Sequence, residues 1–287
     1  MKYCIGDTVV CINVEEQNLH SNFQAFRCDE SEEPQLTIDI VEEPEMTMNI
    51  QMTVGQIMLM ESEEIGVFEG AMGIDLLYPK NVQLTSIAIA KGYRGAKVYV
   101  VQDAEGKWKE ELFLALRDVI YLALEQNGRF VLDSSSLLVD GRGVILAADP
   151  NAEFAGICQG KQIGKILNDS ANIIGIYKER LYLYGTPWCS PEAVQAERAP
   201  LGGIVFLKKS DAGAVTDLPE DKRQLLMLVH CKSPFWREGL LDQCLNTIQR
   251  VEPSVWIRQL ESHADEAAAD VLKPALDTIE NDTVAEY

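Results

Sequence analysis

Apolar and polar residues alternate along much of the first hundred positions. Leu36–Ile40 and Met46–Met52 both alternate with a period of two, which is typical of half-buried strands, and the acidic run 42–45 between them predicts a charged turn. Further strands are predicted at Gln56–Met60, Gly66–Glu69, Leu84–Ala90 and Ala96–Gln102. The chain is therefore predicted to begin with a mostly antiparallel sheet that has acidic loops.

The periodicity changes after Gly106. Between Glu110 and Gln126 the apolar residues recur every three or four positions, which predicts an amphipathic helix that packs by one face. Asn127-Gly128 follows, and both residue types accept the left-handed conformation that ends many helices. The first long helix is therefore predicted over 110–126.

A hairpin and a second group of elements are predicted beyond this helix. Two apolar runs flank Asp140-Gly141-Arg142-Gly143, which has the composition of a tight hairpin turn. Strands are predicted at Gly164–Leu167, Ile173–Tyr177, Arg180–Tyr184, Gly203–Lys208 and Val255–Leu260, and helices at Pro219–Cys231, Phe235–Arg250 and Asp265–Thr278. This change of pattern predicts an acidic β-rich domain over 1–105, an α/β core over 106–280 and a frayed tail over 281–287.

The net charge of −20 restricts the class of partner. A chain this acidic repels phosphate backbones and anionic lipid, so we expect neither a nucleic-acid nor a membrane partner. Residues 1–64 hold 14 acidic and two basic side chains, so they carry −12 of the total. Solvated turns that protect sheet edges explain this concentration, and a docking face for a basic partner is the alternative.

The spacing of the cysteines and histidines indicates neither a disulfide framework nor a metal site. The seven cysteines form no Cys-x-x-Cys pair, and the three histidines lie far apart in the sequence. The N-terminal residues lack the apolar run of a secretion signal, and no apolar stretch approaches the roughly 20 residues of a membrane span. We therefore expect a cytoplasmic protein with free thiols.

Four motifs together resemble a known family. In chain order they are Asp133–Gly143, Ile166–Asp169, the run Leu183-Tyr-Gly-Thr-Pro-Trp-Cys189, and Ala199–Leu207 with Pro-Leu-x-x-Ile-x-Phe-Leu. Over about 111–272 they resemble the HPr kinase and phosphoenolpyruvate-carboxykinase-like family, in particular its small bacterial members, which are often encoded beside peptide-modification genes. The resemblance implies an α/β (α+β) fold, in which an N-terminal mostly antiparallel β domain precedes a mixed-sheet, nucleotide-binding-type core with C-terminal helices. It also implies ATP-dependent phosphoryl transfer with Mg²⁺.

The phosphate loop that the resemblance implies is changed at every functional position. Such a loop reads Gly-x-x-x-x-Gly-Lys-Ser/Thr, and here the first glycine is replaced by Asp149, the second by Phe154 and the lysine by Ala155. Asp149 and Glu153 add negative charge where a triphosphate would lie, at a cost of about 1 kcal/mol or more for each like-charge contact. The expected degenerate loop consists of Asp149, Pro150, Asn151, Ala152, Glu153, Phe154, Ala155 and Gly156.

Two further family positions differ. The usual His-Ala-Ser reads Asp133-Ser134-Ser135, and the usual acidic pair is reduced to Asp169 after Asn168. Asp169 and Asp133 are the candidate catalytic groups, Asp169 is also the candidate Mg²⁺ ligand, and an aspartate at a turn or strand end is the alternative for Asp169. The candidate cleft is lined by Arg142, Lys161, Thr186 and Trp188.

These changes favour a catalytically silent binding or scaffold protein without a cofactor. Its expected partner is a peptide or a peptide-modifying enzyme, and the acidic charge favours a basic one. The first alternative is a phosphotransferase with an atypical phosphate site built from Asp169, Lys161, Lys165 and Arg142, which would use ATP and Mg²⁺. The second alternative is a structural subunit of a homo-oligomer.

Overall fold

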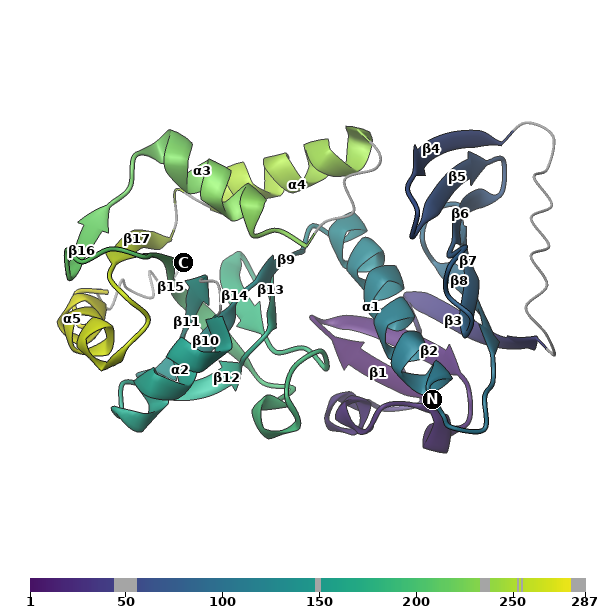
Figure 1. The fold of residues 1–287 in the computed structure, drawn as a ribbon, viewed down its shortest axis with the longest axis horizontal. Helices are drawn as coiled ribbons and strands as arrows, with labels where there is room; N and C mark the ends of the chain where they lie inside the picture. The colour runs from purple at the N-terminus through teal and green to yellow at the C-terminus, as the bar shows by residue number, and fades with distance from the viewer. Residues whose placement is uncertain (44–55, 148–150, 233–237, 252, 254, 280–287) are drawn as a thin grey trace. The chain divides into compact units, whose positions relative to one another are not determined.

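The chain forms two compact units, each with its own mixed sheet. The computed structural model describes residues 1–43, 56–147, 151–232, 238–251, 253 and 255–279. The first unit comprises Met1–Asn127 and Ser233–Gln243, and the second comprises Gly128–Lys232 and Cys244–Tyr287 (Figure 1). The predicted strand Met46–Met52 and the predicted tail 281–287 lie outside the described residues.

The sheet of the first unit has eight strands. β3 pairs in parallel with both β2 and β8, and the other neighbouring strands pair antiparallel, so the sheet is mixed. The parallel pair β2 and β3 is possible because the connection between them is long and contains a short 3₁₀ helix, η2 (Ser21–Phe26). The strand order is β1 (Lys2–Ile5), β2 (Thr8–Asn13), β3 (Leu36–Glu43), β8 (Gly95–Val101), β7 (Leu84–Ala90), β6 (Gly73–Leu77), β5 (Gly66–Gly70) and β4 (Ile57–Glu61).

A long helix, α1 (Trp108–Gln126), packs against β7 and β8. It begins where both carboxylate oxygens of Asp103 accept hydrogen bonds from the backbone N–H groups of Lys107 and Trp108. It ends before Gly128, which has a φ of 70° as the sequence predicts. The contacts therefore group α1 with the first unit, whereas its sequence pattern placed it with the second domain.

The second unit is built on a nine-stranded sheet. Its main path runs β12 (Lys165–Asn168), β10 (Ser135–Val139), β11 (Arg142–Ala147), β15 (Arg198–Lys208), β14 (Arg180–Tyr184), β13 (Ala171–Tyr177) and β9 (Phe130–Asp133). β17 (Trp256–Glu261) pairs in parallel with β15, and β16 (Ala214–Asp217) pairs with β17. The predicted hairpin joins β10 to β11, with Asp140 and Gly141 at φ values of 48° and 78°.

The alternating side chains of β11 separate two hydrophobic cores. Ile145 and Ala147 pack into the core beneath α3 (Glu220–Val229) and α4 (Glu238–Val251). Val144 and Leu146 pack into the core beneath α2 (Asn151–Gly160) and α5 (Glu266–Leu276). Figure 1 shows these two helix pairs on opposite faces of the sheet. A strand segment that is buried on both faces requires apolar residues at consecutive positions, as Val144–Ala147 of β11 has.

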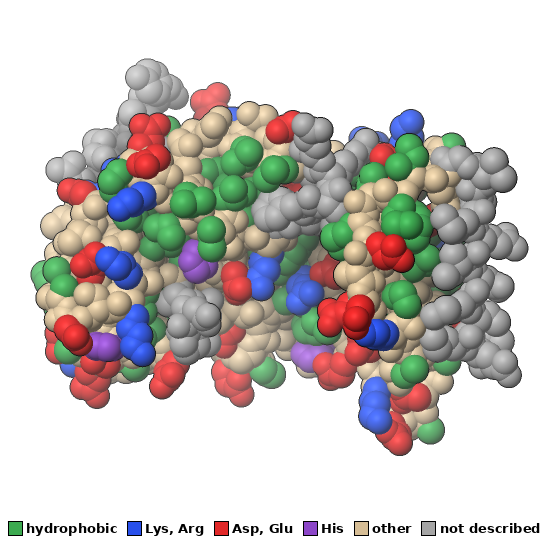
Figure 2. Space-filling model, turned by 45° about the horizontal axis from the view of Figure 1, so that its top comes forward, with side chains coloured by type: hydrophobic (Ala, Val, Ile, Leu, Met, Phe, Trp, Pro, Cys, Tyr) green, Lys and Arg blue, Asp and Glu red, His purple; other side chains and the backbone are tan. Residues whose placement is uncertain are grey.

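Helix α3 also presents apolar residues to solvent. Leu225 is 58% exposed and Val229 is 68% exposed, and Figure 2 shows hydrophobic side chains gathered on this side of the molecule. Among the described residues, no helix combines the length and hydrophobicity that a membrane span requires.

A pair of leucines on α1 tests its packing. Leu116→Ala removes a fully buried side chain and should lower the free energy of unfolding by about 2–5 kcal/mol. Leu114→Ala is the matched control, because this side chain is 42% exposed on the same helix. Urea denaturation of the two variants measures the difference. Equal destabilisation of both would contradict the packing described here.

Candidate functional site

A network of buried polar side chains lies where β9, β10 and β13 meet. Asn172 accepts a hydrogen bond from the Ser136 hydroxyl at 2.6 Å, and its amide donates to the carbonyl and hydroxyl oxygens of Ser134 at 2.6 and 3.1 Å. All three residues are fully buried, as is Ser135. Buried hydroxyls are tolerated when they are hydrogen-bonded inside the fold, as those of Ser134 and Ser136 are, so these two serines support the packing of the strands.

A second buried amide holds the loop after β14. The Asn168 amide donates to the carbonyl oxygen of Thr186 at 3.1 Å and to its hydroxyl at 3.3 Å, and that hydroxyl donates to the carbonyl of Ala171. The neighbouring Gly185 is required by close approach, because a Cβ there would lie 2.0 Å from the carbonyl oxygen of Gln195. In the Tyr-Gly-Thr-Pro-Trp-Cys run, the packing of this loop therefore explains the glycine and the threonine. Trp188 is also buried, at 5% exposed.

Asp169 binds the loop rather than pointing freely into solvent. One carboxylate oxygen accepts the backbone N–H of Ser190 at 2.9 Å, and the other accepts the Ser190 hydroxyl. Ser190 is the residue before a short 3₁₀ helix, η3 (Pro191–Ala193), with proline at its first position. Asp169 therefore fixes the start of η3 against the turn that follows β12.

Asp169 lines a pocket of about 590 Å³ that also contains Lys165, Ser190, Glu192 and Gln195. The Lys165 ammonium donates to the Gln195 side chain at 2.9 Å, and the Gln195 amide donates to the carbonyl of Ile166 at 2.7 Å. Two carboxylates and one ammonium give this lining a net negative charge. Such a pocket suits a small polar or cationic group better than a phosphate.

The positions of the expected phosphate loop are mostly helical. Asp149 and Pro150 lie outside the described residues, and Asn151 to Gly156 form the first part of α2. Phe154 and Ala155 are fully buried in the core between α2, the sheet and α5, whereas Glu153 and Gly156 are exposed. The position that would carry the phosphate-binding lysine therefore faces the core.

The other candidate site residues lie at separate places in the second unit. The Lys161 ammonium pairs with Asp270 at 2.9 Å and Glu266 at 3.4 Å, both on α5. Arg142 lies at the hairpin end of β11, opposite the end from which α2 leaves. Asp133 pairs with Lys232 at 2.7 Å. Of the residues proposed for an atypical phosphate site, Asp169 and Lys165 share the pocket described above.

Sequence reasoning missed the groups that complete this pocket. Ser190, Glu192 and Gln195 carry no family motif, although Ser190-Pro191 has the residues of a helix start. Asn172 was missed because its partners lie 36 and 38 positions away, which no local pattern reports. Among the described residues, no group of three or more His, Cys, Asp or Glu side chains is placed to hold a metal ion.

Comparison with known proteins adds little to this geometry. No family model and no curated protein matches the sequence. Among solved structures, the HPr(Ser) kinase/phosphatase from Coxiella burnetii is similar at 11% identity, with a TM-score of 0.24, over 43% of this chain and 98% of that chain. At that score the similarity establishes neither a shared fold nor a shared activity. The structure itself defines a mixed α/β protein with two mixed sheets.

The buried amide of Asn172 provides one test of the structural interpretation. Asn172→Ala leaves the Ser134 carbonyl and the Ser136 hydroxyl without this partner, which costs about 1–3 kcal/mol for each group left unsatisfied. Asn246→Ala on the exposed side of α4 is the control and should change stability by less than about 0.5 kcal/mol. Chemical denaturation compares them. A neutral Asn172→Ala would show that the network does not support the fold.

Cys189 provides a second test, through its reactivity. Burial, with a smaller contribution from the nearby Asp169 carboxylate, raises the pKa of its thiol to about 12, against the opposing effect of the Asn168 hydrogen bond. Because only the thiolate reacts, iodoacetamide should modify Cys189 very slowly at pH 8 and faster as the pH rises towards that pKa. Asp169→Asn removes a charge that disfavours the thiolate, so Cys189 should react faster in this variant.

Cys158 is the matched control for that experiment. Burial alone raises its pKa to about 12, so Asp169→Asn should leave its alkylation rate unchanged. Peptide mapping by mass spectrometry follows both sites in one sample. Equal acceleration at Cys158 and Cys189 would indicate general loosening of the fold and contradict the local effect.

Proposed function

We propose that this chain is a catalytically silent relative of the HPr kinase and phosphoenolpyruvate-carboxykinase-like proteins that acts as a binding or scaffold protein. The observation that carries the proposal is the burial of Phe154 and Ala155 in the core beneath α2. A phosphate loop needs exposed backbone N–H groups and a lysine that reaches the terminal phosphates. Residues 151–156 are helical, and position 155 has no side chain that could reach a phosphate.

The remaining catalytic candidates support the same proposal. Ser134 and Ser136 are buried and hydrogen-bonded to Asn172, and both carboxylate oxygens of Asp169 are occupied by Ser190. Groups committed to internal hydrogen bonds would have to break them before acting on a substrate. The Ser134 hydroxyl donates to the Leu132 carbonyl and the Ser136 hydroxyl to the Asn172 side chain, and neither acceptor is a base of the kind that activates a serine nucleophile.

The charge of the pocket favours a basic partner. Asp169 and Glu192 outnumber Lys165 in its lining, and the protein as a whole carries −20. A peptide, or a peptide-modifying enzyme that presents a basic surface, would gain long-range attraction to such a chain. The peptide class comes from the family resemblance, and the sign of the partner's charge comes from the residues.

The alternative function is an ATP-dependent phosphotransferase with an atypical phosphate site. One observation favours it: Lys165 and Asp169 line the same pocket, and a cation beside a carboxylate is a minimal arrangement for a phosphate and a Mg²⁺ ion. Lys161 is less suitable, because it is already paired with Asp270 and Glu266. Lys165 therefore distinguishes the alternative from the main proposal.

Calorimetric titration of the full chain with ATP·Mg²⁺ tests both functions. The silent protein should show no binding tighter than about 1 mM, because nothing neutralises the triphosphate. Micromolar binding would overturn the proposal. If that binding is lost in Lys165→Ala but kept in Lys161→Ala, the alternative is supported. Transfer of radiolabelled phosphate to a basic peptide would then establish the activity.

A further inference from the structure

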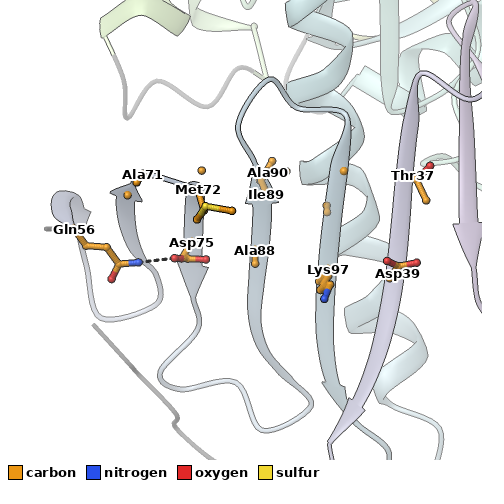
Figure 3. Close-up of a pocket in the computed structure, with 14 residues that line it drawn as sticks. Thr37, Asp39, Gln56, Ala71, Met72, Asp75, Ala88, Ile89, Ala90 and Lys97 are labelled. Atoms are coloured by element: carbon orange, nitrogen blue, oxygen red, sulfur yellow. Dashed lines mark hydrogen bonds between the residues drawn. The ribbon is translucent and has the colours of Figure 1, made fainter. Parts of the chain in front are cut away.

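The first unit has a cavity of its own on the open face of its sheet. Its volume is about 730 Å³, which falls in the range of small-molecule sites, and it lies over β3, β8, β7 and β6 (Figure 3). These residues belong to a different unit from the candidate site described above. The cavity is therefore independent of the proposed function.

The floor of the cavity is a row of residues with almost no side chains. Gly70 pairs with Gly73, and Gly73 pairs with Ala90, on adjacent strands. A Cβ added to Gly95 would lie 3.8 Å from the Cβ of Ala90, so Gly95 continues the row onto β8. Gly73 accepts no substitute, since its φ is 150° and a Cβ there would lie 1.9 Å from the carbonyl oxygen of Ile89. The row leaves a flat surface on which a ligand can lie.

The neighbouring row of the sheet supplies the charges. Asp39 pairs with Lys97, Lys97 with Ala88 and Ala88 with Asp75, so the four side chains share one face. Figure 3 shows Asp39 beside Lys97 and Asp75 on the other side of Ala88. Two strand spacings of about 4.8 Å place Asp75 and Lys97 roughly 10 Å apart along the sheet, with only a methyl group between them.

The carboxylates of Asp39 and Asp75 differ in their hydrogen-bond partners and burial. Asp39 accepts a hydrogen bond from the Asn13 amide at 2.7 Å and is the cross-strand neighbour of Lys97. Asp75 is half-buried and accepts one from the uncharged amide of Gln56 at 2.7 Å. Burial raises the pKa of Asp75, and the Gln56 hydrogen bond acts in the opposite direction. A cation beside Asp75 would relieve this cost of desolvation.

Lys97 presents the complementary charge. Its side chain is exposed, and within the described ranges it forms no ion pair. An anionic group of a ligand could therefore approach it without displacing a partner among those residues. The cavity thus offers a cation and an anion on either side of a small, flat surface.

We propose that this cavity binds a small zwitterion of amino-acid or dipeptide size. Its ammonium group pairs with Asp75, its carboxylate pairs with Lys97, and its body lies over Ala88 and the glycine row. An extended dipeptide has its two charges at opposite ends, and the flexible Lys97 side chain spans the remaining distance. A purely anionic ligand would meet two carboxylates, and a purely cationic one would leave Lys97 unpaired.

Saturation-transfer NMR of the full chain tests the proposal. The probes are the twenty common amino acids and the twenty Ala-Xaa dipeptides, each at about 1 mM. At least one probe should bind, and its N-acetylated and C-amidated forms should bind at least about tenfold more weakly, because each lacks one charge. Absence of binding by every probe, or equal binding of the blocked forms, would overturn the proposal.

Variants locate the binding in this cavity. Asp75→Asn and Lys97→Met should each lower the affinity for the probe by about tenfold or more. Ala88→Leu should abolish binding, because it fills the space without altering charge. Asp7→Asn is the matched control, because Asp7 lies in the turn between β1 and β2 with a φ of 57° that asparagine also accepts. Unfolding midpoints confirm that each variant is folded. Unchanged affinity in folded Asp75→Asn would overturn the assignment, while the ATP titration would stand unaffected.

Discussion

Two buried amides, Asn168 and Asn172, hold together the strands that meet beneath the candidate site. Asn172 joins β13 to the serines at the start of β10, and Asn168 joins the end of β12 to the loop after β14. A buried polar group is tolerated only when its hydrogen bonds are satisfied, so each of these residues requires its partners in fixed places. The Asp169–Ser190 contact, η3 and the pocket beside them depend on that arrangement.

These internal hydrogen bonds also limit which side chains of the site are available to a substrate. A hydroxyl or carboxylate that completes an internal network contributes to stability, and it is not available to a substrate without loss of that contribution. Ser136 and Asp169 are both in this position. A residue type that a phosphotransferase would need can therefore be present because the fold requires it. Motif similarity alone does not distinguish such a structural role from a catalytic one.

Local pattern predicted much of the fold. The period-two strands Leu84–Ala90 and Arg180–Tyr184 have the predicted bounds, and α1 begins two residues earlier than its apolar periodicity indicated. The strands β1, β2, β6 and β16 were missed, because short strands beside turns give too few positions for a period to show. The parallel pairing of β3 with β2 and β8 was also missed, since pairing depends on residues distant in the sequence. For the same reason the sequence did not bring Asp39, Lys97 and Asp75 together in one cavity.

The burial of Phe154 and Ala155 also has an evolutionary consequence. Replacing Phe154 by glycine would open a cavity at a cost of about 3–5 kcal/mol, comparable with a substantial part of the stability of an ordinary domain. A lysine at position 155 would enter an apolar core, where its charge would be strongly disfavoured. Both of these substitutions would destabilise the fold before they produced a phosphate loop. Positions 154 and 155 are therefore constrained by the hydrophobic core, whatever ligand the surface around α2 meets.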